Sequence, residues 1–130
     1  MYTKDVKTKM TLREITKDAL SEILKKHLSW INDEPGGEKA DLSYADLSSA
    51  DLSYANLSYA NLRSADLDMS VFPLWCGSLD IKVDIRLSAQ IAYHFCRFET
   101  ADPEVQKAQK ALKTLANKFH RVGNDVEKIP

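Results

Sequence analysis

The sequence predicts a small α+β protein in which a short coil of stacked, strand-like segments is capped by helices. Three observations carry this prediction. Residues 40–69 repeat with a period of five, residues 12–31 carry apolar side chains at helical spacing, and residues 79–121 hold a period-two stretch followed by two helical ones. With 130 residues, of which 44% are apolar and 28% charged, the chain has ordinary globular composition and the length of a single domain, residues 1–130.

Helical spacing marks the N-terminal flank. Apolar and aromatic side chains recur every three or four residues at Leu12, Ile15, Ala19, Ile23, His27 and Trp30. Thr11 and Glu14 have the spacing of a capping box, which favours a helix start there. Pro35 and two glycines lie in the segment 32–37, which predicts the end of this helix. We expect residues 1–39 to form a helical cap, with 2–10 as a short strand or a frayed arm.

The repeat fits neither regular element. Six successive units over 40–69 keep Ala, then Asp or Asn, then Leu, followed by two variable positions. A helix would scatter the leucines, since five residues advance it by about 500°. A straight strand would place successive leucines on opposite faces. The chain must therefore run extended, turn a corner and repeat, with Ala and Leu inside. Asp, Asn and Ser favour such corners, because their side chains hydrogen-bond to nearby backbone.

These tandem Ala-(Asp/Asn)-Leu-x-x units resemble the pentapeptide-repeat family. The resemblance covers residues 40–69, with 70–74 as a degenerate seventh unit. It implies a right-handed, quadrilateral parallel β-helix of about 20 residues per coil, with coils stacked about 4.8 Å apart. Six or seven units give only about one and a half coils, whereas about three stacked units of structure are usually needed for stability. We therefore expect a solenoid over 40–74 that is capped by both flanks.

The residues after the repeat predict a C-terminal cap over 75–130, built from one strand and two helices. Leu79, Ile81 and Val83 alternate at period two, as in a short strand. Asp84 is placed to cap a helix over about 85–98, with apolar residues Ile85, Leu87, Ile91, Phe95 and Phe98. Asp102 before Pro103 is typical of a helix start, and a second helix is expected over about 103–121.

Charge is unevenly distributed along the chain. The net charge is −1, but residues 40–84 hold seven acidic and two basic side chains, and residues 85–130 hold eight basic and five acidic ones. The near-neutral total argues against nucleic-acid binding by bulk charge. Without an apolar run long enough to span a membrane, a secretory signal or more cysteines than Cys76 and Cys96, the chain is expected to be cytoplasmic in a bacterial cell.

The sequence lacks a convincing catalytic motif, and we expect neither an enzyme nor a cofactor. Cys76, His94, Cys96 and His120 could together supply zinc ligands, but His94 and Cys96 do not have a standard metal spacing. A packed core cysteine is the favoured interpretation of Cys96. The lysines at 107, 110 and 113 share a helix face, for which a solvated surface is favoured over contact with an acidic partner or nucleic acid.

The outward positions of the repeat are the candidate partner-binding residues. They are acidic and tyrosine side chains: Asp41, Tyr44, Asp46, Asp51, Tyr54, Tyr59, Asp66 and Asp68. One interpretation is structural, with Asp shaping corners and Tyr covering the coil. The other is a negative, aromatic surface that imitates phosphates, since tyrosine is enriched at interfaces and binding hot spots. The resemblance adds that some pentapeptide-repeat proteins act as duplex-DNA look-alikes that occupy enzymes such as gyrase.

The layout also resembles small pentapeptide-repeat proteins of phages and prophages, through Trp30, Gly36-Gly37 and Trp75-Cys76-Gly77. The expected function is a non-catalytic binding protein of phage or mobile-element origin. It would act as an inhibitor that blocks a host nucleic-acid-acting or defence complex by docking on a basic surface of that complex. Direct binding to nucleic acid or to a membrane is not expected.

Two alternatives stay open at this point. The first is a small-ligand binder, for a nucleotide as an example, with a pocket between solenoid and helices. Its nearest polar side chains would be Arg86, Tyr93, His94 and Arg97. The second is a structural module that forms a homo-oligomer through an open coil end.

Overall fold

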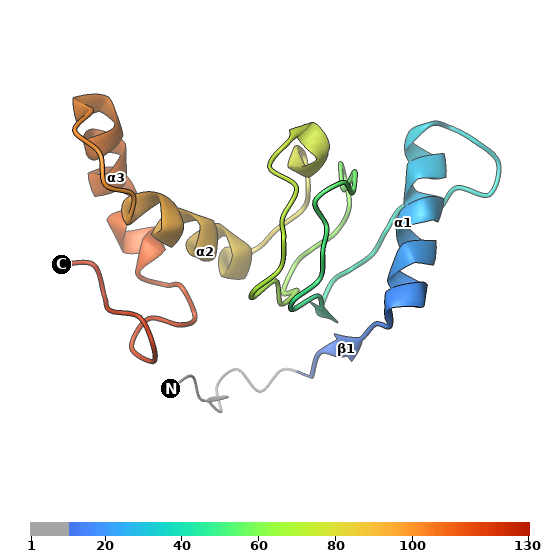
Figure 1. The fold of residues 1–130 in the computed structure, drawn as a ribbon, viewed down its shortest axis with the longest axis horizontal. Coiled ribbons are helices and arrows are strands. Elements are labelled where there is room, and N and C mark those ends of the chain that lie inside the picture. Colours follow the sequence, from blue (N-terminus) through green and yellow to red (C-terminus); the bar gives the residue numbers. More distant parts are fainter. Residues whose placement is uncertain (1–10) are drawn as a thin grey trace. The chain divides into compact units, whose positions relative to one another are not determined.

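The structure, a computed structural model, describes residues 11–130, which form two compact units, residues 11–83 and residues 84–130. Their elements are β1 (Arg13–Glu14), α1 (Lys17–Ile31), β2 (Ala45–Asp46), the 3₁₀ turn η2 (Cys76–Ser78), α2 (Ile85–Cys96) and α3 (Pro103–Ala116) (Figure 1). The strand or arm predicted for residues 2–10 lies outside the described residues. Within residues 11–130, none of the helices has the length and apolar character needed to cross a membrane.

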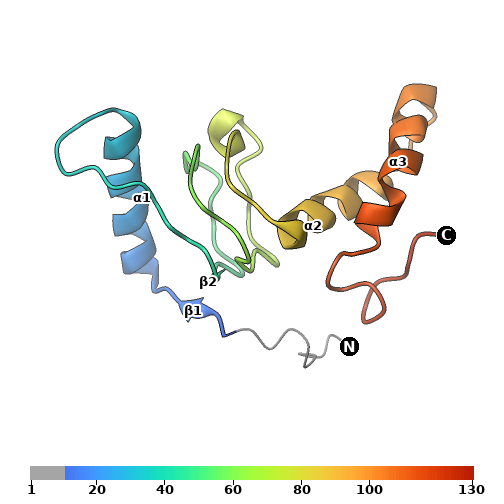
Figure 2. The ribbon, with the colours of Figure 1, turned by 180° about the vertical axis from the view of Figure 1, so that it is seen from behind.

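Residues 40–82 wind into a parallel β-solenoid whose coils lie side by side (Figures 1 and 2). Parallel bridges join Asp41 to Asn61, Asp46 to Asp66 and Asp51 to Val71, so each position pairs with the equivalent position four units later. The leucine that follows each first partner donates its N–H to the second partner's carbonyl, at 2.8 Å in all three places. The predicted solenoid is therefore confirmed.

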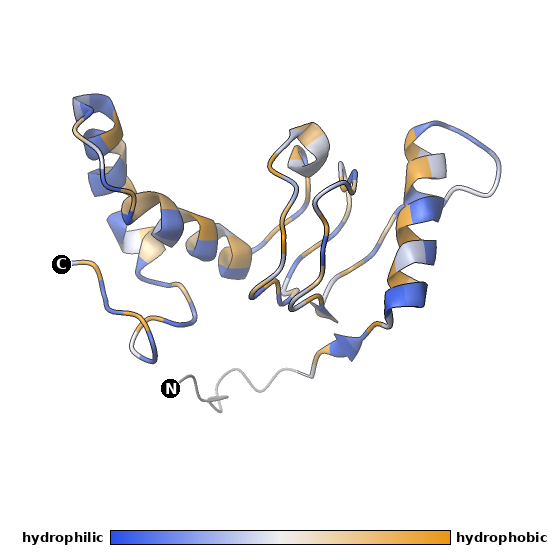
Figure 3. Ribbon diagram, in the orientation of Figure 1, coloured by the Kyte–Doolittle hydropathy of each residue, from blue (hydrophilic) through white to orange (hydrophobic). Residues whose placement is uncertain are grey.

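The leucines of the repeat form the core of this unit. Leu42, Leu47, Leu52, Leu57 and Leu62 are at most 1% exposed, and most alanines of the first position are also buried. Hydrophobic and hydrophilic residues alternate along the coils (Figure 3). The alternation places apolar side chains inside and polar ones outside, as the five-residue period predicts.

Each unit ends in a hydrogen-bonded turn, in which the alanine N–H bonds to the leucine carbonyl three residues earlier, for example Ala45 to Leu42 at 3.1 Å. The residue before that alanine has a φ between 58° and 69° at five corners: Tyr44, Ser49, Tyr59, Ser64 and Met69. A positive φ at the third residue is the mark of a type II turn, which glycine usually fills. Tyr54 occupies the same position without a positive φ, so its corner has a different conformation.

The second coil is one residue longer than the first. Asp51 pairs with Val71 at the four-unit spacing, whereas Asn61 pairs with Lys82, one residue beyond that spacing. The extra residue therefore lies between Val71 and Lys82, and the turn η2 lies in the same segment. Gly77 fits there because a Cβ on it would lie 2.5 Å from the Ala55 carbonyl oxygen.

The solenoid thus continues beyond the predicted boundary at residue 74. Lys82 accepts the Leu62 N–H and donates its own N–H to Ala60, both within 2.9 Å. The prediction of a separate C-terminal strand at 79–84 is therefore wrong. Its period-two pattern belongs to the next rung of the coil, which alternates inward and outward side chains like a strand.

The helix α1 begins at Lys17, five residues later than predicted. Thr16 is the N-cap, and its hydroxyl oxygen accepts the Ala19 N–H at 3.0 Å. The preceding residues are instead taken by β1, which pairs in parallel with β2 in the register Arg13 to Ala45 and Glu14 to Asp46. Pairing with the first coil competes with the helix there, so the predicted capping box of Thr11 and Glu14 is not used.

In the C-terminal unit both helix starts are confirmed. Asp84 accepts the Arg86 N–H at 3.3 Å, and Asp102 accepts the Glu104 N–H at 2.8 Å with Pro103 in the first turn. Helix α3 ends at Ala116, earlier than the predicted residue 121.

The core of the C-terminal unit agrees with the prediction only in part: Leu87 is buried as expected, but the main cluster is different. It consists of Ala92, Tyr93, Ala116 and Phe119, whereas three predicted core residues, Ile85, Ile91 and Phe98, are about half exposed. The spacing of apolar residues along α2 is compatible with burial of either of two neighbouring faces of the helix. The face that carries the small alanines is the buried one, and Val122, Val126 and Ile129 from the chain that follows α3 pack against it.

Candidate functional site

The bridges arrange the outward second positions of the repeat in columns. The first column is Asp41, Asn61 and Lys82, and the third column is Asp51 and Val71. The second column combines Asp46 and Asp66 with Glu14, because β1 pairs Glu14 with Asp46. Second positions of successive units therefore lie in different columns, and those four units apart lie in the same one.

The second column is a row of three carboxylates. Parallel strands lie about 4.8 Å apart, so the side chains of Glu14, Asp46 and Asp66 follow one another at that spacing. A four-sided coil of five-residue units is expected to place Asp66 above Asp46, and the bridge between these residues confirms this stacking. Sequence reasoning missed Glu14, since no local signal pairs it with a residue so distant in the chain. A shallow hollow of about 280 Å³ beside this column is lined by Glu14, Ile15, Thr16, Asp46 and Ser48.

The second-position side chains also shape the corners, as the structural interpretation predicted. The Oδ1 atoms of Asp41, Asp46, Asp51 and Asp66 each accept the backbone N–H two residues later, at 3.0–3.1 Å. Asn56 and Asn61 accept the equivalent bonds at 3.1 Å. An amide oxygen therefore makes the same corner as a carboxylate, and the negative charge is not required for it.

Two of these carboxylates are held in the ionised form. The Ser43 hydroxyl donates to Asp41 Oδ1 at 2.6 Å, and this bond and the Ser43 backbone N–H keep the pKa of Asp41 below its ordinary value. The same pair of bonds from Ser53 keeps the pKa of Asp51 below its ordinary value. Both side chains are therefore negative at neutral pH.

The first column is mixed in charge and closes the edge of the coil. The Arg13 guanidinium donates to the carbonyls of Asp41 and Ser43 at 2.8–3.0 Å, and the Arg13 N–H donates to Tyr44 at 2.8 Å. These carbonyls would otherwise face outward from the first coil, as at any sheet edge. Arg13 thus acts as an N-terminal cap, and the positive charges of Arg13 and Arg63 help to lower the pKa of Asp41. In the first column, Asn61 lies between Asp41 and Lys82.

The eight predicted binding residues do not lie on one surface. Asp46 and Asp66 share the second column, with Tyr44 at a neighbouring corner and Asp68 two residues beyond Asp66. The remaining four lie elsewhere on the coil: Asp41 in the first column, Asp51 in the third, and Tyr54 and Tyr59 at separate corners. The second column is the part of the predicted site that the structure assembles.

Comparison with known proteins identifies the repeat. The family model described as pentapeptide repeats matches residues 38–68 in eight copies. Residues 38–68 belong to the pentapeptide-repeat family. The match ends at Asp68, shortly before the coil takes in its extra residue. Neither the curated proteins nor the solved structures gave a match to this chain.

Helix α1 is fixed to the pentapeptide repeats by His27, a fully buried side chain. The Ala40 N–H donates to His27 Nδ1 and His27 Nε2 lies against the Ser58 carbonyl, both at 2.9 Å, which assigns the proton to Nε2. Burial is the main cause that lowers the pKa of His27, and the nearby Lys39 adds to it. The neutral imidazole therefore joins the helix to two positions of the coil.

An aromatic cluster continues this contact. Trp30 stacks on His27 with ring centroids 5.5 Å apart, and Tyr59 meets Trp30 edge-on at 6.3 Å. The Lys39 ammonium lies 5.6 Å from the Trp30 ring. Tyr59, one of the predicted binding residues, thus has a packing role as well as a half-exposed surface.

Two of the polar residues considered for a small ligand, Tyr93 and Arg97, serve packing in the C-terminal unit. The Tyr93 hydroxyl donates to the Glu127 carbonyl at 2.6 Å and accepts from Arg97 at 2.8 Å. Cys96 donates to the Gln109 carbonyl at 3.3 Å, and burial raises the pKa of its thiol. Over residues 11–130, groups of three or more His, Cys, Asp or Glu side chains placed to hold a metal ion are absent.

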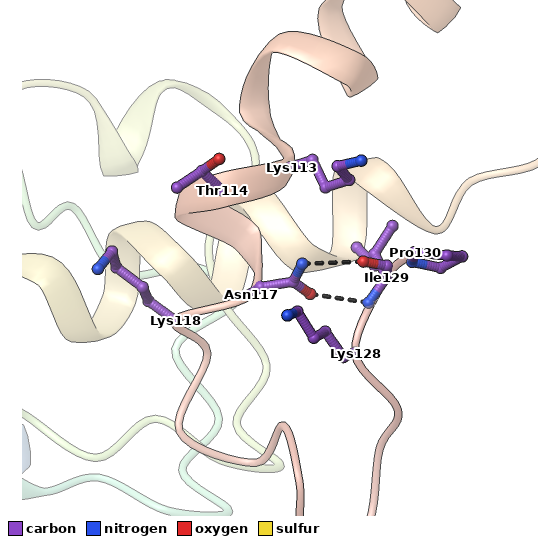
Figure 4. A pocket seen from close by; sticks show the side chains of 7 residues that line it. All are labelled: Lys113, Thr114, Asn117, Lys118, Lys128, Ile129 and Pro130. Carbon is purple, nitrogen blue, oxygen red and sulfur yellow. Dashed lines mark hydrogen bonds between the residues drawn. The ribbon is translucent and has the colours of Figure 1, made fainter.

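A second hollow, of about 590 Å³, lies at the end of α3. It is lined by Lys113, Thr114, Asn117, Lys118, Lys128, Ile129 and Pro130 (Figure 4). Asn117 holds the backbone of Ile129 through two hydrogen bonds of 2.8 and 2.9 Å. The three lysine side chains point in different directions (Figure 4), so they do not converge on one anion.

Proposed function

We propose that this chain is a non-catalytic binding protein whose acidic second column docks on a basic surface of a nucleic-acid-acting or defence complex in a host cell. The observation that carries the proposal is the parallel stacking of Glu14, Asp46 and Asp66 in one row. Since asparagine shapes the same corners, the corner bonds of Asp46 and Asp66 do not depend on their negative charge.

The row suits a surface that ordinarily binds a phosphate backbone. Its charges lie about 4.8 Å apart, and a DNA strand carries one phosphate per about 3.4 Å of helix axis. The row is held by backbone bonds from one coil to the next, such as Leu47 N–H to Asp66 at 2.8 Å. A rigid arrangement of this kind loses little conformational entropy on binding. Half-exposed Tyr44 adds an aromatic side chain at the adjoining corner.

We also infer that the coil is quadrilateral and right-handed. The bridges join positions four units apart, and each unit ends in its own turn, so one coil has four sides. Connections between parallel strands of one sheet are right-handed in nearly all proteins. The second column would then form one side of the coil.

The test removes two of the three negative charges of the second column without removing its corner bonds. The variant is Asp46→Asn with Asp66→Asn, because Asn56 and Asn61 make the equivalent bonds in this chain. The matched control is Asp41→Asn with Asp80→Asn, which makes the same change in charge elsewhere in the unit. Asn tolerates the φ of 60° at Asp80.

Each protein is immobilised and used to capture proteins from a bacterial lysate, followed by mass spectrometry. We expect wild type and control to retain a nucleic-acid-acting protein that duplex DNA displaces, and the second-column variant to lose it. Equal retention by all three proteins, or capture that duplex DNA does not affect, would contradict the proposed function.

A further inference from the structure

An exposed apolar face surrounds the third column. Val71 occupies the position that holds Asp or Asn in the six units before it, and it pairs with Asp51. Within three residues of this pair lie Tyr54, which is 94% exposed, Leu74, 91% exposed, and Met69, 81% exposed. We call Tyr54, Met69, Val71 and Leu74 the apolar face.

The packing of the coil does not explain this face. The interior of the same segment is filled by Pro73, which is fully buried, and by Leu52. Single exposed apolar residues are common on proteins, but several within three residues of one bridge, on two paired coils, favour an interaction site. The solenoid core would be complete without Leu74, because its side chain is almost wholly in solvent.

The charge around the face restricts what can cover it. Residues 49–54 and 69–75 contain no Lys or Arg, and Asp51 lies at the centre of the face. The second column, with Asp46 and Asp66, precedes it by one unit along the coil. Nucleic acid and anionic lipid would be repelled by these carboxylates. A second copy that docked through the same face would set like charges against each other.

We propose that the apolar face and the second column together bind a basic amphipathic segment of a partner protein. Its apolar side chains would pack on Val71 and Leu74, and its Lys or Arg side chains would pair with Asp51 and the second column. This inference rests on the proposed function, in which the partner surface is basic, and it adds that the partner surface also carries exposed apolar side chains.

The test uses a synthetic helical peptide with leucine on one face and lysine on the other, titrated into the full chain by calorimetry. The variant is Val71→Asn with Leu74→Ser, since asparagine is a residue that the repeat itself places at the second position. The control is Leu79→Ser, which removes another exposed leucine of the same unit, outside the apolar face. Losing the burial of these two side chains should weaken binding by about tenfold or more, and the control should change it less than about twofold.

Two results would overturn the inference: equal affinities for the variant, the control and wild type, or a concentration-dependent dimer of the wild-type chain that the variant abolishes. The Asp46→Asn and Asp66→Asn variant separates this inference from the proposed function. If that variant loses peptide binding and Val71→Asn with Leu74→Ser does not, the basic partner stands and the apolar contact is refuted. If Val71→Asn with Leu74→Ser loses peptide binding and the Asp46→Asn and Asp66→Asn variant does not, the apolar contact stands, and the contribution of the second column is refuted.

Discussion

Replacing Met69 by glycine should stabilise the unit of residues 11–83. Met69 has a φ of 62° at its corner, where an L-residue with a side chain is strained by about 1–2 kcal/mol. Glycine removes this strain but gives the unfolded chain more freedom, which costs about 0.5–1 kcal/mol. Because Met69 is 81% exposed, little packing is lost. We expect a net stabilisation of about 0.5–1 kcal/mol.

Tyr54 provides the matched control for this prediction. It occupies the same position of its five-residue repeat and is 94% exposed, but its φ is not positive. Tyr54→Gly should therefore relieve no left-handed strain and should destabilise residues 11–83 by about 0.5–1 kcal/mol. The effect of glycine on the unfolded chain is common to both variants. The two should therefore differ by about 1–2 kcal/mol, which is the strain itself.

The assay is urea unfolding followed by tryptophan fluorescence. The chain has two tryptophans, Trp30 and Trp75, and both lie in residues 11–83, so the signal reports this unit even if the other unfolds separately. The reasoning would be refuted if Met69→Gly unfolded at the same urea concentration as Tyr54→Gly, or at a lower one than wild type.

Three further predictions concern other contacts. First, the pKa of His27 in the folded protein is lowered from 6.5. The stability that depends on the neutral ring is therefore complete above pH 6.5 and is lost as the pH falls through the lower folded value. Urea unfolding of wild type should show a lower free energy of unfolding at pH 5 than at pH 7, and His27→Gln should lack this difference. Second, a Cβ on Gly37 would lie 2.4 Å from the Trp30 backbone nitrogen. Gly37→Ala should therefore destabilise the unit of residues 11–83 by about 1–3 kcal/mol. An unchanged urea midpoint would disprove this contact. Third, Asp102→Ala removes the N-cap of α3 and should cost about 1 kcal/mol in the C-terminal unit. Circular dichroism should detect that loss, and tryptophan fluorescence should not change.

The parts of the fold that depend on local patterns were predictable from the sequence. The repeat of Ala, Asx and Leu indicated the coil because each residue has a role within its own unit: Leu fills the interior and Asx closes the corner. Asp84 and Asp102 indicated helix starts because their caps act over two residues.

The parts that depend on distant pairing were not predictable. The residues of β1 have a good helical pattern, and only their contact with Ala45 and Asp46 makes them a strand. The extra residue after Val71 changed the register of the second coil, so the next rung resembled an independent strand. The predicted binding site was inaccurate for a related reason. Choosing every acidic and tyrosine side chain along the repeat mixed columns, although among these residues the four-unit spacing pairs only Asp46 with Asp66.

The interchange of Asn and Asp at the corners has a consequence for how such a surface can change. Asn56 and Asp51 close their turns with the same bond, so a substitution between them alters the electrostatic potential and leaves the backbone in place. Each rung can thus acquire or lose a negative charge independently of its neighbours. A solenoid of this kind can match a new partner by exchanging single side chains, while its interior stays unchanged.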